Sequence, residues 1–194
     1  MPSCSLEQEA RTGLLHVQFE TIHPFLDGNG RLGRLLIILF LCEKNLLEKP
    51  ILYVSLYLKQ HRTYYYDLLQ NVREKDDWQT WTAFFLEAII ASAQQALDTT
   101  EKINALFLLD TDRINALGRA KFSCLAIIEY AKKNPQFSVA NLVHDIGITA
   151  PTARSAINHL LDLTILKEIT DKKRDKIYRY HDYLTLLESD TQPL

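Results

Sequence analysis

The sequence predicts a mainly α protein, in which a helical first part is followed by a small α+β domain. Three observations support this fold class. Apolar residues recur at helical spacing through the first part, the stretch 92–117 holds neither Pro nor Gly, and β-rich stretches occur only at 165–170 and 176–180. The composition, 47% hydrophobic and 24% charged, is that of a folded chain and excludes a disordered or low-complexity protein.

The first predicted helix carries apolar residues at helical spacing over 6–17 and ends before His23-Pro24, where proline disfavours helical geometry. A break at Gly28-Asn29-Gly30 follows, and a second helix restarts through the apolar run 35–42. Because this run is apolar on every side, we expect it to lie at the centre of the core.

Two later helices complete the first part. Aromatic and apolar residues over 64–72 predict one of them, and Asp76-Asp77 would cap the other, which begins at Trp78. Gly118 marks the expected domain boundary. The expected domains are residues 1–118, residues 119–182 and a C-terminal tail of residues 183–194.

The second domain is expected to hold three helices and two strands. One helix covers about 119–133, a short one follows around 139–146, and a third has Pro151 in its first turn. The β-rich stretches 165–170 and 176–180 then close the domain. Three helices followed by a two-stranded wing are the pattern of a winged helix-turn-helix domain.

Charge is unevenly distributed between the two domains. Residues 119–180 hold 11 Lys/Arg against 6 Asp/Glu, whereas the remaining residues hold 11 against 18. A basic winged helix fits DNA binding, while protein contacts and ordinary solvated surface charge are the alternatives. The candidate DNA-binding residues are Thr152, Arg154, Ser155, Asn158 and His159 on the third helix, and Lys172, Lys173 and Arg174 at the wing tip.

Several classes of protein are excluded or disfavoured. The longest apolar run, 35–42, is far shorter than the roughly 18 residues of a membrane span. The N-terminus has neither a basic start nor an apolar signal segment. Cys4, Cys42 and Cys124 fit free thiols and show no zinc-binding spacing. We therefore expect a cytoplasmic protein with no membrane partner.

Residues 23–34 combine groups suited to binding phosphate. Gly28 and Gly30 flank Asn29 just before a helix, where backbone N–H groups and the helix dipole favour an anion. Arg31 and Arg34 are three residues apart, so both guanidinium groups can lie on one side and contact further phosphate oxygens. Taken singly, each feature is an ordinary turn or a solvated arginine, so the prediction depends on their conjunction.

The same segment holds two further reactive groups. Asp27 offers a carboxylate of the kind that binds Mg²⁺ beside phosphate oxygens. His23 offers an imidazole, which can take a proton from an attacking hydroxyl. The set predicts phosphoryl or nucleotidyl transfer from a nucleoside triphosphate. It is neither a Walker loop nor a dinucleotide-binding fingerprint.

Residues 23–34 resemble the signature of the Fic family, His-Pro-Phe-x-Asp/Glu-Gly-Asn-Gly-Arg-x-x-Arg, and match it at every fixed position. The resemblance includes the preceding residues 16–20 and extends to about residue 118. It implies a Fic-type helical core, to which bacterial members commonly append a winged helix.

The resemblance implies a protein adenylyltransferase, which transfers AMP from ATP to a Ser, Thr or Tyr hydroxyl of a target protein and releases pyrophosphate. His23 would deprotonate the hydroxyl, Asp27 would hold Mg²⁺, and Phe25 would pack inward to hold the loop. Gly30 stands where kinase-type relatives carry Lys, which favours AMP transfer over phosphorylation. The residues implied to bind the ATP phosphates are Gly28, Asn29, Gly30, Arg31, Gly33 and Arg34.

Family members that this chain resembles place several helices and a β-hairpin flap ahead of the motif. Here 22 residues precede His23, so we expect an N-terminally truncated catalytic domain. The inhibitory pattern Ser/Thr-x-x-x-Glu-Gly/Asn found in many members occurs at neither end of the chain.

Two alternatives remain open. In one, the chain is a DNA-binding transcriptional regulator whose Fic remnant is catalytically idle and serves as an interaction or homodimer platform. In the other, His23 supports transfer of a different phosphate-linked group from a different nucleotide.

Overall fold

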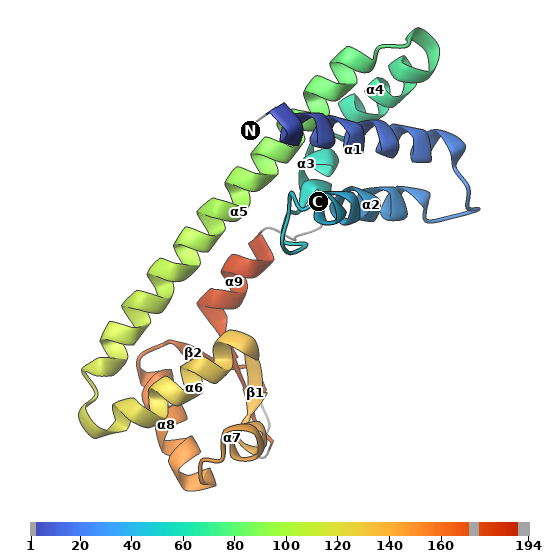
Figure 1. The fold of residues 1–194 in the computed structure, drawn as a ribbon. Coiled ribbons are helices and arrows are strands. Elements are labelled where there is room, and N and C mark those ends of the chain that lie inside the picture. Colours follow the sequence, from blue (N-terminus) through green and yellow to red (C-terminus); the bar gives the residue numbers. More distant parts are fainter. Residues whose placement is uncertain (1–2, 171–174, 190–194) are drawn as a thin grey trace. The chain divides into compact units, whose positions relative to one another are not determined.

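The computed structural model describes residues 3–170 and 175–189 and is mainly α (Figure 1). The described elements are α1 (Ser3–Ile22), α2 (Asn29–Glu43), α3 (Val54–Gln60), α4 (Arg62–Lys75), α5 (Trp78–Asn115), a 3-10 helix (Gly118–Ala120), α6 (Lys121–Lys133), β1 (Gln136–Ser138), α7 (Val139–Ile146), α8 (Ala150–Asp162), β2 (Leu166–Glu168), β3 (Ile177–Tyr180) and α9 (His181–Ser189).

The described residues form two compact units, residues 3–98 and residues 99–189, and α5 runs through the division between them. The predicted boundary at Gly118 coincides instead with the 3-10 helix that follows α5. The assignment of residues 1–118 to a single domain therefore stays a prediction.

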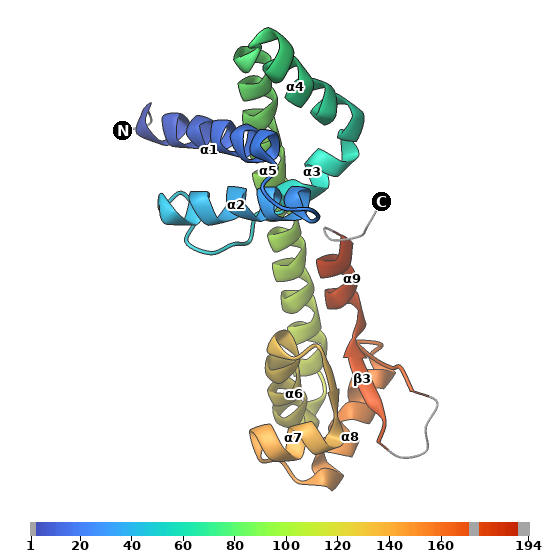
Figure 2. The same ribbon diagram turned by 90° about the vertical axis from the view of Figure 1, so that its right-hand side faces the viewer.

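In the first unit, α1 and α2 form an antiparallel hairpin, and both views show them side by side (Figures 1 and 2). Its hydrophobic core includes Ile37 from α2, Leu68 from α4 and the fully buried Trp81 and Phe85 from α5. Asp77 caps α5 as predicted, because its Oδ1 atom accepts a hydrogen bond from the Thr80 backbone N–H at 3.2 Å.

The expectation that residues 35–42 lie at the centre of the core is wrong. Ile37 and Leu41 are buried, but Leu35 and Leu39 on the other side of α2 are each 52% exposed. The contact with α1 covers one side of the helix, so an all-apolar sequence is buried along only one stripe.

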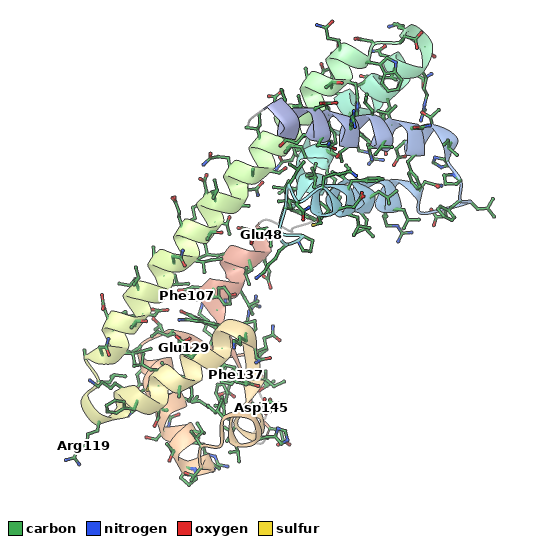
Figure 3. All side chains as sticks on the ribbon, viewed as in Figure 1. Glu48, Phe107, Arg119, Glu129, Phe137 and Asp145 are labelled. Carbon is green, nitrogen blue, oxygen red and sulfur yellow. The ribbon has the colours of Figure 1, made fainter. Side chains whose placement is uncertain are left out.

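The second unit is α+β, with α6, α7 and α8 packed with a three-stranded antiparallel sheet of order β1-β3-β2. The two predicted strands are confirmed as β2 and β3, which pair with Leu166 opposite Tyr180. The sequence prediction missed β1, whose three residues include the buried Phe137 that Figure 3 labels. Residues 183–189 of the expected tail lie in α9.

None of the described helices is both long and apolar enough to cross a membrane. Cys42 and Cys124 are free thiols, as predicted. The side chain of Cys4 lies outside the described residues.

Candidate functional site

His23 ends α1 in a left-handed backbone conformation, with φ 48°. Its N–H still donates to the Phe19 carbonyl at 3.0 Å, and Pro24 follows, which cannot continue the helix. His23 itself is exposed. The His-Pro pair therefore stops α1 and leaves the imidazole in contact with solvent.

The loop after His23 is held by the side chain of Asn29. Its Oδ1 atom accepts from the Phe25 N–H at 2.9 Å, and its Nδ2 atom donates to the Phe25 carbonyl at 2.5 Å. The expectation that the Phe25 ring packs inward is wrong, because Phe25 is 52% exposed. The main chain of Phe25, and not its ring, fixes the loop through the buried Asn29.

Gly28 precedes α2 with φ 84°, a conformation that favours glycine. The first backbone hydrogen bond of α2 runs from the Leu32 N–H to the Gly28 carbonyl at 3.0 Å, and no side chain caps the helix. The N–H groups of residues 29–31 therefore lack partners within the helix and lie at its positive end. This is the geometry of an anion site.

Asp27 stands at the rim of this site. Its Oδ1 atom accepts from the Gly28 N–H at 2.7 Å, and its Oδ2 atom lies 3.5 Å from Arg31. Both side chains are largely exposed, so the ion pair is weak and easily rearranged. A single exposed carboxylate fits Mg²⁺, which commonly binds one or two carboxylates together with phosphate oxygens and water.

Arg34 and Arg31 extend toward different glycines of the loop. The position that a Gly30 Cβ would occupy is 3.3 Å from Arg34 Nη1, while the corresponding Gly28 position is 3.6 Å from Arg31 Nη2. Among the described residues, the Arg34 side chain forms no hydrogen bond or ion pair. The two arginines thus stand beside different glycines of one loop.

A small cavity of about 280 Å³ opens at Arg34. Two further cationic side chains, Lys59 and Arg62, line it, and the Arg62 guanidinium lies 5.7 Å from the centre of the Tyr66 ring. The sequence analysis missed these two residues, because their separation of 25 and 28 positions from Arg34 gives no local signal. The complete lining is Arg34, Leu58, Lys59, Arg62, Tyr65 and Tyr66.

A buried polar layer on α1 supports the loop from behind. His16 lies within hydrogen-bond distance of the Gly33 carbonyl (Nδ1, 3.1 Å) and of the Tyr65 hydroxyl (Nε2, 2.9 Å). Burial lowers the pKa of His16 to about 4 and raises the pKa of Glu20. Glu20 is 7% exposed, and its Oε1 atom has no hydrogen-bond partner among the described residues.

Gly33 faces this layer. A Cβ at Gly33 would overlap Glu20 Oε1 and lie 3.2 Å from a ring carbon of His16, so glycine lets these buried side chains pack directly against α2. The structure gives Gly33 this packing contact, and its predicted contact with phosphate stays a prediction. Glu20 could have been noticed in the sequence as a carboxylate one helical turn before His23.

A larger groove of the first unit lies elsewhere. A groove of about 1160 Å³, lined mainly by apolar side chains of α1, α4 and α5, contains none of the motif residues 23–34. This groove is therefore separate from the candidate site.

The candidate DNA-binding residues of α8 lie on an exposed face. Thr152, Arg154, Ser155 and Asn158 are exposed, and His159 is half-buried. Arg154 and Asn158 border a groove of about 930 Å³ that also includes Lys176 of the strand region. The wing-tip candidates Lys172, Lys173 and Arg174 lie outside the described residues.

The loop and the start of α2 have the geometry of an anion site at a helix N-terminus. Comparison with known proteins agrees with this class: residues 5–41 match the Fic/DOC family. A stretch of 35 residues is 56% identical to a probable protein adenylyltransferase of Aquifex aeolicus. This stretch covers 18% of the present chain and 11% of that relative, so the chain spans about a tenth of the relative's length.

Proposed function

We propose that the first unit is a Fic-type protein adenylyltransferase, which transfers AMP from ATP to a hydroxyl side chain of a target protein. The observation that carries this proposal is the uncapped start of α2, where the N–H groups of residues 29–31 lack helical partners next to Arg31 and Arg34. The Fic/DOC similarity of residues 5–41 supports the same chemistry.

In the proposed reaction, His23 takes the proton of a Ser, Thr or Tyr hydroxyl. The hydroxyl oxygen then forms a bond to the α-phosphorus of ATP, and the bond from that phosphorus to the bridging oxygen of the β-phosphate breaks, so pyrophosphate leaves. The N–H groups of Asn29 and Gly30 and the Arg31 guanidinium would stabilise the charge on the α- and β-phosphates. Arg34 would contact the γ-phosphate, and Lys59 and Arg62 stand beside it in the same cavity.

Asp27 would hold Mg²⁺ against the phosphates. Bound there, the ion would neutralise phosphate charge. Asp27 itself would then exchange its weak contact with Arg31 for the ion, which would release Arg31 toward the phosphates.

The proposal is tested with ATP labelled on either the α- or the γ-phosphate, incubated with Mg²⁺, this chain and an extract of hydroxyl-bearing target proteins. Label from the α-phosphate, and not from the γ-phosphate, should appear on protein. The His23→Ala variant should lose at least about 100-fold of this rate. His144→Ala is the matched control, because His144 is an exposed histidine of the second unit and should leave the rate unchanged. Protein labelling that survives His23→Ala would contradict the mechanism.

A second candidate function is DNA binding by the second unit as a winged helix. It is favoured by the exposed face of α8 and by the groove where Arg154, Asn158 and Lys176 come together. On this alternative the first unit is catalytically idle and serves as an interaction or homodimer platform.

DNA binding is tested by gel shift on duplex DNA over a range of salt concentrations. Replacing Arg154 with Ala should weaken binding and reduce the slope of log affinity against log salt by about one. Replacing Lys172, Lys173 and Arg174 together should reduce the slope further, whereas Lys102→Ala on the exposed side of α5 should not. Absence of binding at low salt would remove this candidate.

A further inference from the structure

Glu20 is an unusual residue to find behind an anion-binding loop. Glu20 is only 7% exposed, and its Oε1 atom has no hydrogen-bond partner among the described residues. Burying a carboxylate without a partner is costly, and replacing it with a neutral group of the same shape is often neutral or stabilising. Packing of the core therefore does not explain why a carboxylate is buried at position 20.

The surroundings of Glu20 show where that charge acts. Its Oε1 atom lies 4.0 Å from the point that a Gly30 Cβ would occupy, and Arg34 Nη1 lies 3.3 Å from the same point. Burial raises the pKa of the Glu20 carboxyl, while the positive charges of His23, Arg34 and Arg73 oppose that rise. The carboxylate and the Arg34 guanidinium thus flank one glycine of the loop.

Of these three residues, Arg34 is the one that Glu20 can orient. Arg73 is already fixed, because it donates to the Glu20 carbonyl at 2.9 Å and to the Thr21 hydroxyl at 3.2 Å. His23 is exposed, so water screens its interaction with the carboxylate. Arg34 is half-buried, and within the described part of the chain its side chain forms no hydrogen bond or ion pair, with Glu20 or with any other residue.

Tyr65 is a neighbour of both Arg34 and Glu20. Tyr65 and Arg34 line the same small cavity, and the pKa of Tyr65 is raised first by burial and then by the charge of Glu20. Arg34 therefore borders a cavity that is open to a ligand and interacts electrostatically with the buried carboxylate of Glu20.

We propose that Glu20 is a positioning residue, which holds the Arg34 guanidinium toward the terminal phosphate of a bound nucleoside triphosphate. This inference rests on the proposed function. Glu20 lies behind Gly30 and Gly33, on the α1 side, so it acts through Arg34 and does not touch the nucleotide.

The test measures binding of ATP and of ADP, each with Mg²⁺, by isothermal titration calorimetry. The wild-type chain should bind ATP more tightly than ADP, because only ATP offers a terminal phosphate to Arg34. Glu20→Gln keeps the shape and removes the charge, and it should reduce the preference for ATP by about tenfold, toward that of Arg34→Ala. Glu20→Asp retains a carboxylate and should keep more of the preference than Glu20→Gln. Glu7→Gln, an exposed residue of the same helix, should change nothing.

The double variant Glu20→Gln/Arg34→Ala separates positioning from a general structural effect. It should show the same preference as Arg34→Ala alone, because Glu20 has no role once Arg34 is removed. An independent further loss would overturn the inference, as would an unchanged preference in Glu20→Gln. Thermal unfolding of Glu20→Gln should show no loss of stability, and a marked loss would mean that Glu20 is structural.

These outcomes also separate the inference from the proposed function. A wild-type chain that prefers ATP over ADP but transfers no α-phosphate label would contradict the adenylyltransferase proposal. The binding data for the Glu20 variants would still decide whether Glu20 positions Arg34. A chain that transfers label without any preference for ATP in binding would overturn the role of Glu20.

Discussion

The Nε2 atom of His16 lies 2.9 Å from the Tyr65 hydroxyl, so a buried hydrogen bond joins α1 to α4 behind the loop of residues 23–28. The His16 ring also stacks on Trp81, with ring centroids 6.0 Å apart. Burial, aided by the charge of Arg34 and opposed by the hydrogen bond to the Gly33 carbonyl, lowers the pKa of His16 from 6.5 to about 4.

The pH dependence of folding should report this histidine. The unfolded chain takes up a proton at His16 near pH 6.5, whereas the folded chain does so only near pH 4. The stabilisation from neutral His16 is therefore complete above pH 6.5 and is lost progressively as the pH falls toward 4, by about 3 kcal/mol in all. Urea unfolding at pH 7 and pH 4.5 should show a smaller decrease for His16→Gln than for the wild type. Equal decreases in the two proteins would contradict the prediction.

Gly33→Ala should destabilise the first unit. The added Cβ would displace the Glu20 carboxylate and crowd the side chains of His16 and Phe19 at 3.2 Å, so these buried groups must repack. We expect a loss of about 1–3 kcal/mol in the free energy of unfolding. Gly30→Ala is the control, since its Cβ meets only Arg34 and Glu20, at 3.3 and 4.0 Å, and alanine favours the helix. Equal costs at the two positions would argue against a packing role for Gly33.

Asn29→Ala should open the loop. The substitution removes both hydrogen bonds to the Phe25 main chain from a side chain that is 2% exposed, and should cost about 1–3 kcal/mol. Protein labelling from ATP should fall with it, because the N–H groups at the start of α2 lose their fixed direction. The exposed Asn104 of α5 provides the control Asn104→Ala. A stable Asn29→Ala variant with full activity would show that other contacts hold the loop.

Tyr180→Phe should destabilise the second unit through Asp110. The Tyr180 hydroxyl donates to Asp110 Oδ2 at 2.8 Å, and Asp110 is 2% exposed. Removing this donor leaves a buried carboxylate oxygen with one partner fewer, at a cost of about 1–3 kcal/mol. Tyr183→Phe should cost less, because its longer bond to the Lys132 carbonyl, 3.3 Å, is only partly buried. Urea unfolding of both variants measures the two losses in the free energy of unfolding. A larger loss for Tyr183→Phe would refute the prediction.

Local sequence signals predicted much of the fold. His23-Pro24 ends α1 and Asp77 caps α5, each at the position expected from the residue type. The strands β2 and β3 also lie within the predicted stretches. These features depend on a few neighbouring residues, so the sequence is sufficient to locate them.

No such local signal predicts β1 or the cavity beside Arg34. A three-residue strand is too short to show alternation, and β1 is defined by pairing with β3, with Phe137 opposite Tyr178. The cavity combines Arg34 with Lys59 and Arg62, residues from separate helices that no spacing rule connects.

The sequence by itself determined the chemistry of the loop: a histidine, a carboxylate, glycines at a helix start and two arginines, all within residues 23–34. Only the tertiary structure decided which side of each helix is buried. On α1 the buried positions include the polar Thr12, His16 and Glu20, and on the all-apolar α2 they follow one stripe. Periodicity assigns residues to helix faces, but it does not say which helix covers each face. Here α1 covers one face of α2, and the two helices pack closely at Gly33. That approach places the buried carboxylate of Glu20 behind the loop of residues 23–28.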